Sequence, residues 1–289
     1  MLKDISIVLV TYNSEHIISS FLNQPQLKKN KIYIVDNASS DKTTILIENN
    51  FKSVNLIKLK KNIGFGSAIN KGLKKIKTKY ALIINPDTFL SKTFFKDLEK
   101  AIKKYSNAGM IAPTIIDNSK FKNPPQSEFL ISNTNIQPKH DQKTNFVHGA
   151  CFLIDPSLFK NREIFDKNIF LFFEDNDLSE QVLKKNLDLI ILGNCFVYHQ
   201  GEKSSKKTSK IVSLRNFHYG WSHCYFTKKY NSNIYSYLFI FYLLLINLKR
   251  FLFASVVFNK NRSLPSYNRC KGIIAFTIGK KSKDLRDNI

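Results

Sequence analysis

Short apolar strands alternate with amphipathic helical stretches over residues 1–112, and this alternation constrains the fold more than any other feature. The strand candidates are rich in Ile and Val, and the stretches between them repeat apolar residues at helical spacing. Such an order predicts an α/β fold with a mostly parallel sheet and helices on both faces. The expected strands are residues 5–10, 32–35, 54–59 and 81–84, and the expected helices are residues 15–29, 41–50, 65–77 and 91–105.

The rest of the chain changes character twice. Residues 113–145 are polar and proline-bearing, which predicts a long surface excursion. Residues 146–154 and 187–198 are expected to be further strands, and the Lys- and Ser-rich residues 201–210 a mobile connection. Beyond residue 211 the pattern is helical and aromatic. A chain of 289 residues can therefore hold an α/β domain at 1–205 and a helical, membrane-associated tail at 206–289.

An apolar run in this tail points to a lipid surface. Residues 235–246 are almost wholly apolar, but Asn247, Lys249 and Arg250 interrupt the run before residues 251–258. A spanning helix needs about 20 consecutive apolar residues, so we expect the run to fall short. Basic residues beside an apolar face are typical of a helix that lies on an anionic membrane. A helix packed against the protein's own core is the alternative.

The formal net charge of +23 would attract nucleic acid, anionic lipid headgroups or phosphorylated substrates. However, Lys, Asn and Ile are abundant along the whole sequence, so the charge does not identify a partner. The sequence shows no interleaved aromatic and basic RNA-binding pattern, and we expect no specific nucleic-acid partner.

The cysteines and the N-terminus bear on location. Cys151, Cys195, Cys224 and Cys270 lie far apart without C-x-x-C spacing, which is typical of reduced core residues in the cytosol. No charged-then-apolar leader precedes the first strand. We therefore expect a cytoplasmic protein that lies peripherally on the inner face of the cell membrane.

Polar loops follow three of the predicted strands. They begin at Thr11, Asp36 and Asn85, and the carboxyl ends of parallel strands form the ligand-binding edge of such a sheet. Residues 62–72 carry spaced glycines that permit close backbone approach, without the Gly-Lys-Ser/Thr of a P-loop. We expect these loops to line one cleft.

A cluster of acids stands against apolar residues at 171–177. Carboxylates beside a low-dielectric wall tend to have raised pKa values and can accept a proton from a hydroxyl group. The alternative is helix capping by Asp175 or Asp177. With Asp87, the cluster suggests an enzyme that carries acids on two separate loops.

Seven stretches, in order over residues 5–205, carry a resemblance to a known family. They are Ile7-Val8-Leu9-Val10-Thr11-Tyr12-Asn13, Val35-Asp36-Asn37-Ala38-Ser39-Ser40-Asp41, residues 62–72, Asn85-Pro86-Asp87, His148-Gly149-Ala150, Phe173-Glu174-Asp175-Asn176-Asp177 and His199-Gln200-Gly201-Glu202. The chain resembles the family 2 glycosyltransferases of the GT-A fold, in particular the rhamnosyltransferase-like enzymes that build bacterial surface polysaccharides.

The resemblance implies an inverting hexosyltransferase. Its donor would be a dTDP- or UDP-activated hexose, and its acceptor a saccharide or a polyprenyl-diphosphate-linked saccharide. A divalent cation, Mg²⁺ or Mn²⁺, would bridge the diphosphate oxygens, with Asp87 as ligand and His199 as a further one. The residues implied in donor binding are Thr11, Asn13, Asp36, Asn62, Gly64 and Asn85.

Asp175 is the expected general base for the acceptor hydroxyl, with Glu174 and Asp177 as second choices. Two positions depart from the family pattern. Asn85 stands where the fold usually carries the first acid of an Asp-x-Asp motif, and Gln181 stands where related enzymes commonly have Arg.

Several alternatives stay open from the sequence. Asp36 can serve a turn, residues 62–72 can serve helix packing, and His199 can be a structural hydrogen-bonded residue. At the level of function, the alternatives are a nucleotidyltransferase and a non-enzymatic basic protein that binds nucleic acid or membrane.

Overall fold

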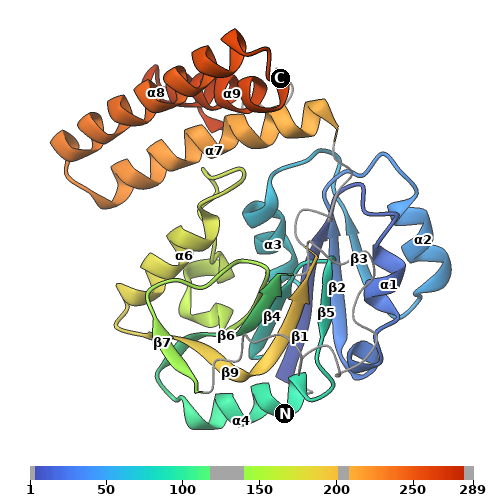
Figure 1. Ribbon diagram of the computed structural model, residues 1–289. Coiled ribbons are helices and arrows are strands. Elements are labelled where there is room, and N and C mark those ends of the chain that lie inside the picture. The colour runs from blue at the N-terminus through green and yellow to red at the C-terminus, as the bar shows by residue number, and fades with distance from the viewer. Residues whose placement is uncertain (1–3, 118–139, 201–207, 283–289) are drawn as a thin grey trace. The chain divides into compact units, whose positions relative to one another are not determined.

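Among the residues that the structure describes, nine strands form one mixed sheet in the first of two structural units (Figure 1). The structure is a computed structural model, and it describes residues 4–117, 140–200 and 208–282. The first unit holds the sheet and its covering helices. The second unit combines residues 63–67 and 166–177 with the C-terminal helices.

The bounds of the elements follow the chain. The strands are β1 (Ile5–Thr11), β2 (Lys31–Asp36), β3 (Asn55–Lys58), β4 (Tyr80–Ile84), β5 (Thr88–Leu90), β6 (Ala108–Asp117), β7 (Gln142–Thr144), β8 (Cys151–Ile154) and β9 (Asp188–His199). The helices are α1 (Ile18–Leu22), α2 (Thr43–Asn50), α3 (Phe65–Leu73), α4 (Phe94–Lys104), α6 (Glu174–Leu183), α7 (Ser209–Tyr230), α8 (Asn233–Val256) and α9 (Lys260–Thr277), with short 3₁₀ helices at Pro25–Lys29, Pro156–Leu158 and Lys160–Arg162.

The order of strands across the sheet is β3-β2-β1-β4-β8-β6-β9-β5, with β7 paired to β9. The strands β3, β2, β1 and β4 are parallel, and the register pairs Thr11 with Asp36. Beyond β4 the sheet is mixed, because β8 is antiparallel to both of its neighbours while β6 and β9 run parallel. The predicted fold class is confirmed, and the four adjacent parallel strands β3, β2, β1 and β4 all come from the first half of the chain.

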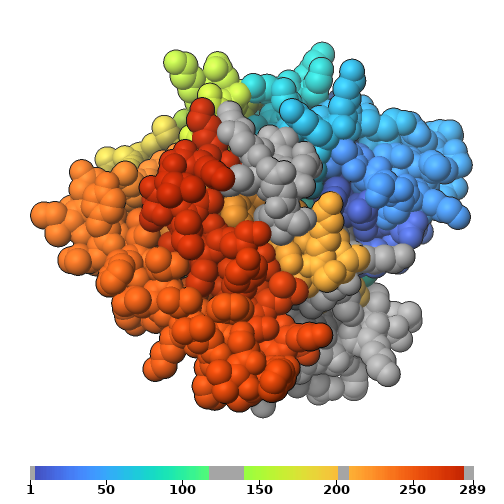
Figure 2. All heavy atoms as spheres, turned by 90° about the horizontal axis from the view of Figure 1, so that it is seen from above, coloured from blue at the N-terminus to red at the C-terminus, as the bar shows by residue number. Residues whose placement is uncertain are grey.

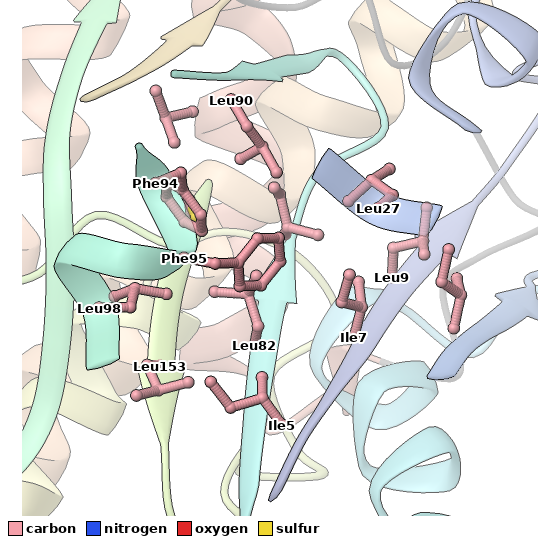
Figure 3. Packing of buried hydrophobic residues seen from close by; sticks show 14 of the residues in the cluster. Ile5, Ile7, Leu9, Leu27, Leu82, Leu90, Phe94, Phe95, Leu98 and Leu153 are labelled. Atoms are coloured by element: carbon pink, nitrogen blue, oxygen red, sulfur yellow. The ribbon is translucent and has the colours of Figure 1, made fainter. Parts of the chain in front are cut away.

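The core lies on both faces of the sheet, as expected for buried parallel strands. All seven residues of β1 are buried. Ile7 and Leu9 point into the cluster that also contains Leu82, Phe94 and Phe95 (Figure 3). On the opposite face, a Cβ atom added to Gly72 of α3 would meet the side chains of Val8 and Val35. Helices therefore pack closely against each face.

Some sequence-based bounds are wrong for local reasons. The helix expected over residues 15–29 is instead α1 and a 3₁₀ helix, because Pro25 lacks the N–H that a continuing helix needs. The surface excursion expected from residue 113 begins too early, since Pro113 lies inside β6, next to a register shift against β9. The strand expected from residue 146 starts at Cys151. The predicted excursion over 118–139 and most of the Lys/Ser connection lie outside the described residues.

In the second unit, α7 and α9 pack side by side through glycine positions (Figure 1). A Cβ atom on Gly272 would collide with the carbonyl oxygen of Phe217, and one on Gly220 with that of Arg269. Only glycine allows the two helices to come this close. The four cysteines are free and buried, as predicted.

Within the described residues, α8 is one continuous helix that is long and apolar enough, by length and composition alone, to cross a membrane. The expectation that the run falls short is wrong, because the helix continues through Lys249 and Arg250 and its 24 residues remain apolar enough despite these two charges. Only 17% of its most apolar window is buried, which does not support the core-packed alternative. Figure 2 shows α7, α8 and α9 as spheres in orange and red.

Candidate active site

Asp36 organises the loop that follows β2. It is 2% exposed. Its carboxylate oxygens accept three hydrogen bonds, from the Thr11 hydroxyl at 2.9 Å and from the Ser39 N–H and hydroxyl at 2.9 and 2.6 Å. A carboxylate offers about four acceptor positions, so these contacts use most of its capacity. They fit the turn alternative, and donor binding by Asp36 stays a prediction.

Asn13 ties the loop after β1 to the loop after β2. Its backbone adopts a left-handed conformation at φ 52°, which Asn tolerates better than most residues. Its side-chain oxygen accepts the N–H of Ser40 at 2.8 Å, and its own N–H donates to the Ser39 hydroxyl at 2.9 Å. The first two predicted loops therefore form one hydrogen-bonded edge, with Thr11 and Asn13 beside Asp36.

Asn62 and Asn85 border the same edge. Asn62 accepts a hydrogen bond from the Asn37 side chain at 2.8 Å. Asn85 follows β4, which lies parallel to β1, and its N–H donates to the carbonyl of Ala150 at 2.9 Å. The half-buried Asn85 side chain is at the carboxyl end of the strands, where ligands bind in such sheets.

Asp87 and His199 meet in the first unit. The Asp87 carboxylate is 1% exposed, and its Oδ1 atom lies 3.3 Å from Nε2 of His199. The contact arises because β5 pairs with the end of β9, which places Thr88 opposite His199. Within the described parts of the chain, no group of three or more His, Cys, Asp and Glu side chains forms a metal site. The pair fits a cation that takes most of its ligands from water and diphosphate oxygens.

No role for His148 was predicted from the sequence, although it lies in one of the resembling stretches. Its ring centroid is 5.8 Å from that of His199. Its Nδ1 atom accepts the N–H of Ala150 at 3.1 Å, so the proton of the neutral ring is on Nε2. An Nε2–H group donates a hydrogen bond and cannot at the same time ligate a metal. His148 therefore suits a ligand oxygen better than a cation.

Residues 166–177, which we name the acid loop and which end in the first turn of α6, contact one face of α7 within the second unit. The contacting residues His218, Ser222, Tyr225 and Lys229 recur at intervals of four, three and four, which places them on one side of a helix. His218 packs against Phe170 with ring centroids 4.4 Å apart, and the Ser222 hydroxyl donates to the carbonyl of Leu171 at 2.8 Å. The C-terminal helices therefore form the surface on which the acid loop lies.

The backbone just before the acids is strained. Phe172 and Phe173 have φ values of 66° and 64°, a left-handed conformation that costs roughly 1–3 kcal/mol per bulky residue. The Phe173 ring stacks on His223 with centroids 4.6 Å apart, and Arg215 lies over the Phe172 ring. Such conformations persist where the surroundings hold them, and they are frequent at functional sites.

The three candidate acids have different environments. Burial, together with the charge of Asp175, raises the pKa of Glu174 to about 8. Asp177 is fully buried, and its Oδ1 atom lies 2.6 Å from Nζ of Lys229. Asp175 is half-buried, and its Oδ1 atom accepts the N–H of Asn176 at 2.9 Å. Near neutral pH, Glu174 therefore holds its proton and Asp177 forms an ion pair.

Gly64 belongs to the second unit, where it packs against Phe170. Its φ of 86° and the close approach of the Phe170 backbone exclude a Cβ atom. The neighbouring Phe65 N–H donates to the Phe170 carbonyl at 3.2 Å. These contacts explain the glycine by packing, as in the alternative given for residues 62–72, and nucleotide contact by Gly64 stays a prediction.

Gln181 stands where related enzymes commonly have Arg. Its side-chain amide donates a hydrogen bond to the Ile164 carbonyl at 3.4 Å.

Curated proteins with similar sequences are glycan-building enzymes. The chain is 23% identical over 210 residues to the low-salt glycan biosynthesis hexosyltransferase Agl10 of Haloferax volcanii; the match covers 68% of this chain and 66% of that protein, just under two thirds. It is 21% identical over 262 residues to the N-acetylglucosaminyl-diphospho-decaprenol L-rhamnosyltransferase of Mycobacterium tuberculosis, which covers 74% of this chain and 85% of that protein.

Solved structures share the fold at low sequence identity. The mannosyltransferase PcManGT of Pyrobaculum calidifontis, in complex with GDP-Man and Mn²⁺, has a TM-score of 0.57 and 12% identity, covering 96% of this chain and 88% of its own. TarS 1–349 of S. aureus, in complex with UDP-GlcNAc, has a TM-score of 0.52 and 16% identity, covering 96% and 92%. The GT-A fold expected from the sequence is confirmed.

The pattern of the family described as "Glycosyl transferase family 2" matches residues 6–162. That span covers β1 to β8, and so includes the loops that carry Thr11, Asp36 and Asp87. The match sets aside both the nucleotidyltransferase and the non-enzymatic basic protein. The chain belongs to glycosyl transferase family 2.

Proposed function

We propose that this enzyme moves a hexose from a UDP- or dTDP-activated donor to a saccharide on a polyprenyl-diphosphate carrier, with inversion at the transferred sugar. The observation that carries the proposal is the contact between the buried Asp87 and the half-buried His199. This pair lies in the unit whose polar loops after β1, β2 and β4 form the carboxyl edge of the sheet. UDP-GlcNAc bound to TarS supports the donor class, and the decaprenol-linked substrate in the name of the mycobacterial relative supports the acceptor class.

Asp87 would hold the cation, Mg²⁺ or Mn²⁺, and His199 would add a nitrogen ligand that suits Mn²⁺. When bound, the cation supplies positive charge to the departing nucleoside diphosphate. The Mn²⁺ in the PcManGT complex supports a cation of this kind. Asn85 in place of a second acid leaves one carboxylate in the Asn85-Pro86-Asp87 stretch.

Asp175 would take the proton of the acceptor hydroxyl, as an inverting transfer requires of one carboxylate. Two properties of the neighbouring acids favour Asp175 over them. Glu174 carries a proton near neutral pH, because burial raises its pKa to about 8. Asp177 is engaged by the Lys229 ammonium group. Asp175 is thus the acid best suited to accept a proton.

A lipid-linked acceptor requires access to a membrane, and α8 offers a surface for it. Its outward face exposes large apolar side chains along its length, among them Leu238 at 67%, Phe241 at 61% and Leu252 at 54%. From residue 209 to residue 277 the sequence has no Asp or Glu, whereas it has many Lys and Arg. An apolar face in a segment whose charged residues are all basic complements anionic lipid. The positive charge of this segment disfavours its pairing with the same segment of a second protein molecule.

We propose that α8 lies in the plane of the leaflet rather than across it, on the inner face of the cell membrane. α9 packs along α8 and α7 within the same unit, and it carries Lys260, Arg262, Arg269 and Lys271. If α8 crossed the bilayer, these neighbours would carry their charges into hydrocarbon, at a cost of roughly 2.5–3.5 kcal/mol each. Lys249 on α8 can reach the headgroups by extending its stem.

Replacing Phe241, Leu245 and Leu252 by Ser should weaken binding to vesicles that contain anionic lipid by about 10²-fold or more, since each loses more than 1 kcal/mol of apolar transfer energy. Vesicle co-sedimentation of the full chain measures this. Substitution suits the test better than truncation after residue 232, because α9 packs on α7. Ile45→Ser is the control, as Ile45 is also exposed, at 55%, but lies in the first unit. Equal binding by both variants would contradict the proposal.

A panel of nucleotide sugars tests the proposed function itself. With Mn²⁺ present, one UDP- or dTDP-hexose should raise the melting temperature by roughly 4–5 °C at a hundred times its dissociation constant. Incubation with a polyprenyl-diphosphate saccharide should then release nucleoside diphosphate and form a glycoside. If no nucleotide sugar stabilises the protein and none is turned over, the proposal fails.

A further inference from the structure

Lys229 on α7 contacts carboxylates at both ends of the acid loop. Its Nζ atom lies 2.7 Å from Oδ2 of Asp166 and 2.6 Å from Oδ1 of Asp177. Tyrosine hydroxyls complete both contacts, since Tyr225 donates to Asp166 at 2.9 Å and Tyr230 to Asp177 at 2.8 Å. One ammonium group therefore joins the first and last residues of the loop to the same helix.

The segment between these two contacts holds the candidate catalytic acids of the second unit. It contains the left-handed Phe172 and Phe173, followed by Glu174 and Asp175. A strained backbone keeps its conformation only where its surroundings hold it. The contacts at Asp166 and Asp177 hold both ends of the acid loop, and this limits the conformations open to the residues between them.

Charge balance makes the contact necessary for the local structure. Asp177 is 0% exposed and Asp166 is 13% exposed. Burial would raise the pKa of Asp166, but hydrogen bonds from Lys229, Asn168 and Tyr225 hold it below its ordinary value. Removing Lys229 would take an ammonium charge away from the buried Asp177 and the half-buried Asp166, within a segment that already concentrates four acids.

We propose that Lys229 is a positioning residue, which holds the acid loop on α7 and thereby places Asp175 for proton transfer. The inference rests on the proposed function, because it assigns a role within that reaction. It makes the C-terminal helices part of the catalytic apparatus as well as the membrane-facing surface. The alternative role, in which Lys229 itself binds a phosphate of the substrate, gives different results in the test below.

The test compares Lys229→Met with Lys229→Arg in the full chain. We expect Lys229→Met to lower kcat by about 10- to 10²-fold, since misplacing a catalytic group by about 1 Å costs up to about 10²-fold. The KM for the donor should stay within about twofold, because a shift confined to an acceptor-side base leaves donor binding intact. Lys229→Arg keeps a cation that can donate to both carboxylates and should hold kcat to within about threefold of the wild type. The control Lys228→Met removes an adjacent, exposed lysine and should behave as the wild type.

Asp166→Asn separates positioning from direct binding. If Lys229 acts through Asp166, the double variant Lys229→Met/Asp166→Asn should lose no more activity than Lys229→Met alone. Fully additive losses, or a loss that appears in the donor KM, would overturn the proposal in favour of substrate binding. Should Lys229→Met not fold, the single variant Asp166→Asn decides the question. A kcat lowered about three- to tenfold would support the proposal, and full activity would overturn it. Wild-type protein that is inactive with every donor would instead overturn the proposed function.

Discussion

Asp175→Asn should lower kcat by about 10²- to 10⁴-fold, which is the usual contribution of a positioned general base. The amide keeps the shape of the carboxylate and can still accept the Asn176 N–H, so a capping role alone predicts nearly normal rates. Donor affinity should change little, because the lost group acts only as the acceptor hydroxyl gives up its proton. Steady-state kinetics with varied donor and acceptor measures both quantities.

Glu174→Gln is the matched control for this variant. At pH 7 the Glu174 carboxyl is largely protonated, because burial and then the charge of Asp175 raise its pKa from 4.5 to about 8. Gln resembles that neutral form, so the loss in kcat should be small. If Glu174→Gln abolishes turnover while Asp175→Asn does not, the base is misassigned. Normal rates in both variants and in Asp177→Asn would contradict a catalytic acid loop.

The same control has a second readout in stability. The folded-state pKa of Glu174 lies above the unfolded value, so its contribution is fully present below about pH 4.5 and is lost as pH rises through about 8. The free energy of unfolding of the wild type should therefore fall across this window. Glu174→Gln should flatten that part of the curve, as measured by denaturant unfolding at several pH values.

Asp87→Asn should reduce donor binding and turnover together, by about 10²-fold or more, since the buried carboxylate is the proposed anionic ligand for the cation. The fold should survive, because the backbone carbonyl of Asp87 still accepts the Gln200 N–H at 2.9 Å. Thermal shifts with the donor, at increasing Mn²⁺ concentration, measure binding apart from rate.

His199→Gln tests the second proposed ligand of the same site. Donor binding and turnover should fall less than in Asp87→Asn, because the carboxylate stays. Mn²⁺ should support activity better than Mg²⁺ in the wild type and lose that advantage in His199→Gln, since nitrogen ligands favour Mn²⁺. Full activity of Asp87→Asn, or unchanged wild-type activity in excess EDTA, would rule out the metal role.

Local signals in the sequence predict the parallel strands β1 to β4 and the polar loops at their carboxyl ends. The alternation of Ile and Val with helical stretches predicts β1 to β4, and the polar loops after them bring Thr11, Asn13 and Asp36 together as expected. The strand β5 has only three residues, too few for a pattern, although it places Asp87 beside His199.

The sequence could not predict what supports the acid loop, because the contacts join distant residues. Lys229 lies 63 positions from Asp166, and nothing in either stretch marks the other as a partner. A polar helix face is indicated by the spacing of His218, Ser222, Tyr225 and Lys229. That spacing does not indicate which segment of the chain packs on the face. The role of Gly64 is similar, since its close contact with Phe170 is set by tertiary structure.

The second unit is assembled from three separate stretches, residues 63–67, residues 166–177 and the helices from residue 208 onward. A chimera joined at residue 206 would therefore combine the acid loop of one parent with the α7 of another. Such hybrids should fail unless the complementary residues at 166, 177 and 229 come from a common parent. Engineering a new acceptor preference in this scaffold thus calls for exchanging the three stretches as a set.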